Sequence, residues 1–176
     1  MIGIAALANL LAPSPIIGAF LFCFGLFAVV VNNGKLCTGM FGNCNKIEQW
    51  FEALYVCLIN IIVAMFFGLL VKVCGVKIPE VIIYDNNLLT VAIKSILCGI
   101  MIHIGVKSYK KGSYITMLIA VMLFVLSGFE HCVANAFLIG SNTNLEFYLI
   151  IPFLINIAGN IIGAKFIEYF CDKSQI

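Results

Sequence analysis

The chain has 176 residues, of which 63% are hydrophobic and 10% are charged, and its formal net charge is +2. A soluble domain carries roughly 25% charged residues, so this composition excludes a soluble globular protein and predicts an all-α integral membrane protein. A helix needs about 20 apolar residues to cross a bilayer, so the length allows about six crossings in one transmembrane domain over residues 1–176. The ten lysines form no basic face, which argues against nucleic acid as a partner.

The first part of the chain contains an interrupted apolar segment. Residues 1–12 are apolar but short, and we interpret them as the last turns of a truncated first helix, followed by a proline-containing turn. Residues 16–31 form a continuous apolar run, whereas residues 32–42 contain three asparagine or lysine residues and three glycines. Each glycine costs a helix about 1 kcal/mol relative to alanine. The sequence therefore predicts a membrane helix that breaks at depth and resumes for a short piece.

The next predicted elements are three uninterrupted crossings and the polar segments between and after them. The crossings are 53–71, 88–106 and 147–164. The polar segments are an exposed connection at 72–87, a basic loop at 107–113, a turn at 141–146 and a tail at 165–176. Lysines in the basic loop and the tail favour a cytoplasmic position for both.

Residues 114–140 form a second interrupted segment, which is apolar but carries Glu130, His131 and Asn135 just after Ser127 and Gly128. Ionisable groups at bilayer depth are costly and usually mark a functional pathway. Two broken helices in corresponding parts of a chain suggest inverted repeats around a site near the membrane midplane. Half-helix N-termini carry partial positive charge, which suits an anion.

Three short motifs in these segments resemble one transporter family. Residues 128–137, GFEHCVANAF, resemble the GFEHSxANMF motif of the formate/nitrite transporter family. Residues 36–39, LCTG, are similar to its LFTG loop, and residues 159–163, GNIIG, to the GNIIGG motif of its last helix. The resemblance covers nearly the whole chain. It implies an aquaporin-like bundle of six helices, with one pore in each protomer of a homopentamer, in the inner or plasma membrane of the cell.

The resemblance also implies which residues line the pore. His131 corresponds to the family's central histidine and Thr38 to its loop threonine, with a hydrophobic constriction on each side. Matching by offset from Thr38 places the constriction residues as Phe22 and Leu26 on the cytoplasmic side, and Leu36, Phe124 and Ile102 on the periplasmic side.

The chemistry of an anion in a narrow apolar pore suggests a role for each polar group. Moving a bare ion into a low-dielectric medium costs of order 20 kcal/mol before relaxation. His131 is the only side chain in its segment that exchanges a proton near neutral pH. We hypothesise that His131 donates a hydrogen bond or a proton to the anion, and that Thr38 is a second donor. Glu130, Asn135 and Asn160 are expected to anchor the broken loops.

Two departures from the family pattern leave alternatives open. The family usually has an asparagine in the fourth helix, where this chain has Gly99, and its vestibule lysine has no counterpart at the right spacing. Lys94 and Lys77 are candidates by proximity. The leading hypothesis is a channel or proton-coupled transporter for small monovalent weak-acid anions such as formate, nitrite or hydrosulfide. A non-conducting structural member of the family is the first alternative.

The second alternative is a membrane-embedded enzyme or metal site that uses His131, Cys132, His103 and Glu130. These residues lack the close ligand spacing of known metal motifs. None of the eight cysteines forms a C-x-x-C pair, and we interpret them as small buried packing groups. His103 is expected at the membrane interface. No catalytic residue, metal or cofactor is predicted.

Overall fold

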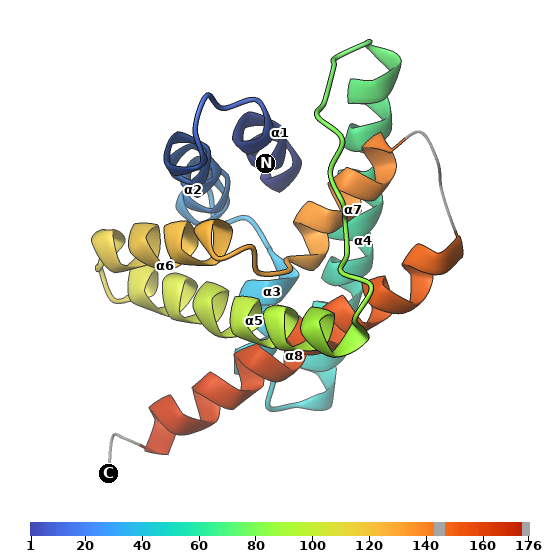
Figure 1. The fold of residues 1–176 in the computed structure, drawn as a ribbon. Helices are drawn as coiled ribbons and strands as arrows, with labels where there is room; N and C mark the ends of the chain where they lie inside the picture. The colour runs from blue at the N-terminus through green and yellow to red at the C-terminus, as the bar shows by residue number, and fades with distance from the viewer. Residues whose placement is uncertain (143–146, 174–176) are drawn as a thin grey trace.

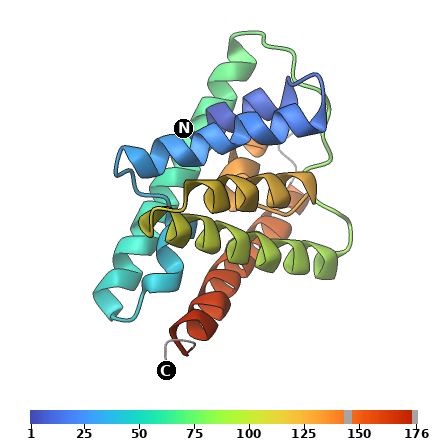
Figure 2. The same cartoon turned by 90° about the vertical axis from the view of Figure 1, so that its left-hand side faces the viewer.

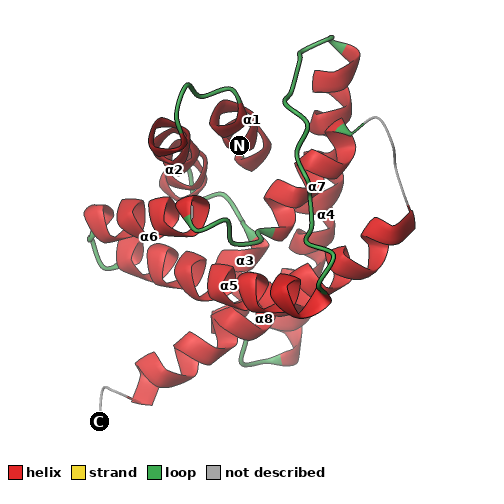
Figure 3. Ribbon diagram, in the orientation of Figure 1, coloured by secondary structure: helices red, strands yellow, loops and turns green. Residues whose placement is uncertain are grey.

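The chain folds into helices joined by turns. The computed structural model describes residues 1–142 and 147–173, and no strand occurs within those ranges (Figure 1 and Figure 3). The helices, in chain order, are α1 (Ile2–Leu10), α2 (Pro15–Val31), α3 (Cys37–Met40), α4 (Ile47–Val73), α5 (Leu88–Lys110), α6 (Tyr114–Leu126), α7 (Cys132–Ser141) and α8 (Ile150–Lys173), with 3-10 turns η1 (Phe41–Asn43) and η2 (Phe147–Leu149). The predicted all-helical class is confirmed.

Three of these helices are long and apolar enough to cross a membrane. These are α4, α5 and the Ile150–Cys171 part of α8, whereas α2, α6 and α7 are shorter apolar helices. Large apolar side chains are exposed along α4, including Leu58, Ile62 and Phe66. An apolar surface of this kind is expected on a helix that faces lipid. The chain is therefore a multi-pass membrane protein.

Both predicted helix breaks are present. Helix α2 ends at Val31 and α3 begins at Cys37, while α6 ends at Leu126 and α7 begins at Cys132. Each break contains a residue with positive φ, Asn33 at 53° and Gly128 at 63°. Asparagine and glycine are the residues that adopt this left-handed conformation most readily. The chain can therefore turn sharply at these two points and expose backbone groups at membrane depth.

The two halves of the chain share part of their packing pattern, although α5 packs on α8 far more extensively than α1 packs on α4. In each half the first helix packs against the first piece of the broken helix, α1 on α2 and α5 on α6. The last helix of each half packs against the part of the other half that follows its helix break. These contacts join α4 with α7, and α8 with η1, the turn that follows α3. Figure 2 shows α2, α6 and α5 stacked in layers, with α4 and α8 crossing them. This arrangement agrees with the inverted repeats predicted from the sequence.

Glycines allow the long helices to approach closely. A methyl group on Gly140 of α7 would lie 2.0 Å from the Met65 carbonyl oxygen of α4. On the other side, a methyl group on Gly163 of α8 would lie 2.0 Å from the Ile96 carbonyl oxygen of α5. Small residues at helix contacts are the usual means of tight packing in membranes, where the hydrophobic effect gives no drive for helix association.

The predicted polar tail at 165–176 is wrong for its described part, because α8 continues to Lys173. Its polar residues have partners that the sequence does not reveal. The Lys165 ammonium donates to the Gly42 carbonyl at 3.1 Å and to Asn45 Oδ1 at 3.2 Å, and lies 5.5 Å from the centre of the Trp50 ring. The start of the predicted basic loop, residues 107–110, likewise belongs to α5. The predicted turn at 141–146 lies mostly outside the described residues.

Candidate functional site at the junction of the broken helices

The second pieces of the two broken helices begin at a buried polar pair. Thr38 lies in α3 and is 0% exposed, and His131 is the N-cap residue of α7 and is 1% exposed. Thr38 Oγ1 and His131 Nε2 are 3.2 Å apart. The structure therefore brings together two residues that are 93 positions apart in the sequence and that the motifs singled out independently.

The hydrogen bonds of the His131 ring define its tautomer. Nδ1 accepts a hydrogen bond from the Ala134 backbone N–H at 3.2 Å, so this nitrogen carries no proton. A neutral imidazole then has its proton on Nε2 and donates to Thr38 Oγ1. Because the threonine oxygen accepts from the histidine, the hydroxyl proton of Thr38 is left to donate elsewhere. The pair thus presents a hydrogen-bond donor at the junction.

Two asparagines close the breaks in the same way. Asn60 of α4 accepts from the Cys37 N–H at 3.1 Å and donates to the Lys35 carbonyl at 3.3 Å. Asn160 of α8 accepts from the Cys132 N–H at 3.0 Å and donates to the Glu130 carbonyl at 2.8 Å. In both cases the amide bridges residues i and i+2 across the start of the second helix piece. We call these contacts the two amide clamps.

The amide clamps satisfy backbone groups that the helix breaks would otherwise leave unpaired in an apolar medium. Asn160 is one of the residues nominated from the sequence, whereas Asn60 was missed. The signal that could have found Asn60 is an asparagine inside an otherwise apolar crossing.

Glu130 lies in a buried network of amides. Its carboxylate accepts from Asn135 Nδ2 at 2.6 Å, and its carbonyl accepts from Asn156 Nδ2 at 2.7 Å as well as from Asn160. Asn156 also accepts from the Tyr84 hydroxyl at 3.2 Å. Burial raises the pKa of Tyr84, which keeps this hydroxyl protonated as a donor. These contacts hold the loop in place, and none of them turns the Glu130 carboxylate toward the Thr38–His131 pair.

An aromatic group lies against the histidine. The Phe124 ring stacks on the His131 ring with centroids 5.9 Å apart, and the Phe22 ring meets Phe124 edge-on at 5.5 Å. The offset argument assigned Phe22 to the cytoplasmic constriction and Phe124 to the periplasmic one. Their rings contact each other, so the two residues lie at adjacent positions beside His131. The assignment of each residue to a constriction stays a prediction.

The remaining nominated constriction residues are buried apolar side chains. Leu36, Leu26 and Ile102 are 6%, 0% and 1% exposed. A methyl group placed on Gly105, one turn beyond Ile102 on α5, would contact Leu26 at 3.8 Å. Leu36 instead lines a cavity of about 240 Å³ that also borders Lys35 and Asn60. Leu26 therefore packs toward α5, while Leu36 lies at the end of an open cavity.

The two candidate vestibule lysines lie in different surroundings. Lys94 is half-buried on α5, and its charge acts on the Glu130 carboxyl. Lys77 is exposed in the connection between α4 and α5. The structure does not bring either of them to the Thr38–His131 pair.

His103 is buried within the protein, and its position at the membrane interface stays a prediction. It is 1% exposed, and its Nε2 donates to the Glu168 carboxylate at 2.7 Å, which also accepts from the Lys107 ammonium at 2.6 Å. Its ring packs against the backbone of Gly42 in η1. The sequence could not reveal this ion pair because Glu168 lies in the segment expected to be a polar tail.

Buried polar groups at the point where two broken membrane helices meet are typical of membrane channels and transporters. Comparison with protein families narrows the class: residues 1–171 match the model of the formate/nitrite transporter family. The chain belongs to this family. The family resemblance seen in the sequence motifs is thereby confirmed.

Solved structures with the same fold agree with this assignment. An FNT family ion channel is 19% identical with a TM-score of 0.73, over 95% of this chain and 80% of that one. A pentameric formate channel with formate bound is 19% identical with a TM-score of 0.75, over 97% of this chain and 90% of that one. A search of curated protein sequences finds no match. At this identity the likeness establishes the fold, and both neighbours are channels rather than enzymes.

Proposed function

We propose that the protein is a channel or proton-coupled transporter for small monovalent weak-acid anions such as formate, nitrite or hydrosulfide. The observation that carries the proposal is the Thr38–His131 pair, a buried hydrogen-bonded pair whose threonine hydroxyl can donate, at the point where both broken helices begin again. Membership of the formate/nitrite transporter family and the solved formate channel of the same fold support it. By the same analogy we propose a homopentamer with one pore per protomer, in the cell membrane.

The Thr38 hydroxyl and the N-terminus of α7 would both stabilise the anion. An anion that approaches Thr38 accepts a hydrogen bond from its hydroxyl, which the His131 Nε2–H polarises. The N-terminus of α7, at His131, adds a partial positive charge on the same side. These donors replace water around an ion that would otherwise meet a large desolvation cost.

Full proton transfer requires a further change at the histidine. The ring can take up a second proton only when Nδ1 gives up its hydrogen bond from Ala134, because a protonated Nδ1 cannot accept. In the structure described, His131 is therefore a neutral hydrogen-bond donor. Proton-coupled transport would include a step in which the first turn of α7 releases the ring.

Two hydrophobic constrictions would bracket the pair. By resemblance to the family, Phe22 and Leu26 would form one constriction, and Leu36, Phe124 and Ile102 the other; all five side chains are buried and apolar. The apolar side chains exclude water and hydrated ions, so only a small anion that exchanges its water for the donors can pass.

Glu130, Asn135 and Asn160 would hold the loop that presents the histidine rather than contact the anion. A carboxylate facing the route would repel the permeant ion. Lys94 and Lys77 stay the proposed candidates for the lysine that attracts anions to the vestibule. Lys35 lines the cavity and is a third candidate, although its ammonium is paired with Glu52.

Anion flux into proteoliposomes at two pH values tests the proposal. Thr38→Val keeps the side-chain shape and removes the hydroxyl, and His131→Phe removes both ring nitrogens. Each is expected to reduce formate flux more than tenfold, while Thr90→Val, in the first turn of α5, leaves it unchanged. Wild-type flux that survives both pore substitutions at each pH would overturn the mechanism. No flux through the wild-type protein would favour the non-conducting alternative.

A further inference from the structure

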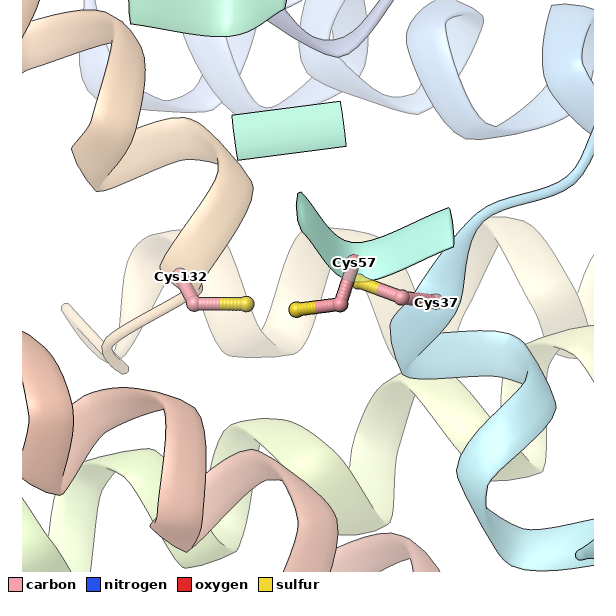
Figure 4. A group of neighbouring side chains, drawn as sticks. All are labelled: Cys37, Cys57 and Cys132. Atoms are coloured by element: carbon pink, nitrogen blue, oxygen red, sulfur yellow. The ribbon is translucent and has the colours of Figure 1, made fainter. Parts of the chain in front are cut away.

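Three buried cysteines from three separate segments meet beside the Thr38–His131 pair. Cys37 is the first residue of α3, Cys132 is the first residue of α7, and Cys57 lies in α4. Their sulfur atoms all lie within 4.8 Å of one another, and their exposures are 0%, 0% and 4%. Figure 4 shows the Cys57 and Cys132 sulfurs pointing toward each other, with the Cys37 sulfur beside that of Cys57. We call this group the thiol cluster.

The spacing of the thiol cluster fits a shared metal ion. Metal–thiolate bonds are about 2.3 Å long, so three sulfurs around one trigonal ion are about 4 Å apart. Sulfurs already within 4.8 Å of one another reach that arrangement by small side-chain adjustments. The cysteines are all reduced in the structure, so none of these sulfurs is held in a disulfide.

The number and type of ligands select the ion. Within the described residues, no histidine, aspartate, glutamate or fourth cysteine joins the group. His131 is close along the chain, but both of its ring nitrogens are engaged. Structural zinc sites are almost always four-coordinate, whereas soft thiolates without a hard ligand favour monovalent copper. We propose that Cys37, Cys57 and Cys132 form a three-sulfur binding site for a soft monovalent cation of the Cu(I) class.

A cavity lies close to the cluster along the chain. The cavity of about 240 Å³ is lined by Leu36 and Val133, the sequence neighbours of Cys37 and Cys132. It is also lined by Asn60, which lies one helical turn from Cys57 on α4. Each of the three cysteines is thus one residue or one helical turn away from a residue of the cavity wall.

One feature of the local structure favours a thiolate in the cluster. Cys132 is in the first turn of α7, where the helix dipole stabilises negative charge on its sulfur. Each thiol that binds as a thiolate releases one proton to solvent, and no electron is transferred because the metal is supplied as Cu(I). One Cu(I) offsets the charge of one thiolate, and each further thiolate adds a buried negative charge that raises the cost of binding. Binding at the cluster requires no ion conduction, so it stands apart from the proposed function.

Cu(I) titration of the reduced, full-length protein in detergent tests the site. The protein competes anaerobically with a colorimetric Cu(I) chelator, and X-ray absorption of the bound metal counts its sulfur ligands. We expect one Cu(I) per chain bound by three sulfurs. Cys57→Ser and Cys132→Ser should each weaken binding more than about tenfold.

Matched controls separate the cluster from the other thiols. Cys23→Ser and Cys98→Ser also change buried cysteines, but these lie outside the cluster, and both variants should bind as the wild type does. Gel filtration establishes that each variant is folded, and Cys57→Ala serves as a second variant where the serine form is not. The assignment would be overturned if the wild type bound no Cu(I). It would also be overturned if a variant lacking all three cluster cysteines bound one Cu(I) per chain with the wild-type affinity.

Discussion

The amide clamps make a quantitative prediction about stability. Asn160 is 0% exposed and makes three hydrogen bonds, accepting from the Cys132 N–H and donating to the carbonyls of Ser95 and Glu130. Asn60 is only half-buried and makes two, with Cys37 and Lys35. Replacing each asparagine with leucine keeps the volume nearly constant and removes the polar groups.

The expected loss follows from these contacts. In Asn160→Leu the buried Cys132 N–H is left without its partner, which costs about 1–3 kcal/mol. The two donated bonds contribute about 0.5–1.5 kcal/mol each, although the Glu130 carbonyl keeps its bond from Asn156. The free energy of unfolding should therefore fall by about 2–5 kcal/mol. In Asn60→Leu the loss should be about 1–2 kcal/mol, because water can reach the exposed side of the clamp.

Unfolding in mixed detergent micelles, followed by circular dichroism as the denaturing detergent fraction rises, measures both differences. The decisive result is which variant loses more free energy of unfolding. That order depends on the difference in burial between the two asparagines, and an error common to both measured energies does not change it. Equal losses, or a loss below about 0.5 kcal/mol in Asn160→Leu, would refute the reasoning that buried backbone groups need this amide.

Two further substitutions test the packing and the buried ion pair. Gly140→Ala should lower the thermal midpoint of unfolding strongly, because the added methyl group would lie 2.0 Å from an α4 carbonyl oxygen. Gly105→Ala should leave the midpoint unchanged or raise it, because no atom lies closer than 3.6 Å to its added methyl group. Equal midpoints in the two variants would contradict this. Glu168→Gln should reduce the free energy of unfolding by about 2 kcal/mol at neutral pH, because His103 and Lys107 lose a shared carboxylate. Denaturation in detergent measures that loss, and an unchanged midpoint would show that the ion pair contributes nothing.

The helices and their breaks could be predicted because both depend on local sequence. Long apolar runs predict crossings, and the positive-φ residues Asn33 and Gly128 lie in segments whose composition already argues against a continuous helix. The end of α8 could not be predicted in this way. Its polar residues look like an exposed tail until Lys165 and Glu168 are seen to bond to η1 and α5.

The candidate site could be predicted only in part. His131 stood out as an ionisable residue in an apolar segment, and Thr38 was nominated because its loop resembles a family motif. Which groups contact one another is a property of the assembled bundle, so the Phe22–Phe124 contact and the thiol cluster were not foreseeable. The six-helix aquaporin-like description and the roles of the loop anchors stay predictions.

The amide clamps have a consequence for how the molecule is put together. Each clamp joins groups from its own half of the chain, Asn60 with Lys35 and Asn160 with Glu130. Each helix break can therefore form its amide clamp before the two halves of the chain pack together in the bilayer. The bond between Thr38 and His131 crosses from one half to the other and forms only when they dock. Assembly would then finish at the Thr38–His131 pair, which is the proposed site of anion passage.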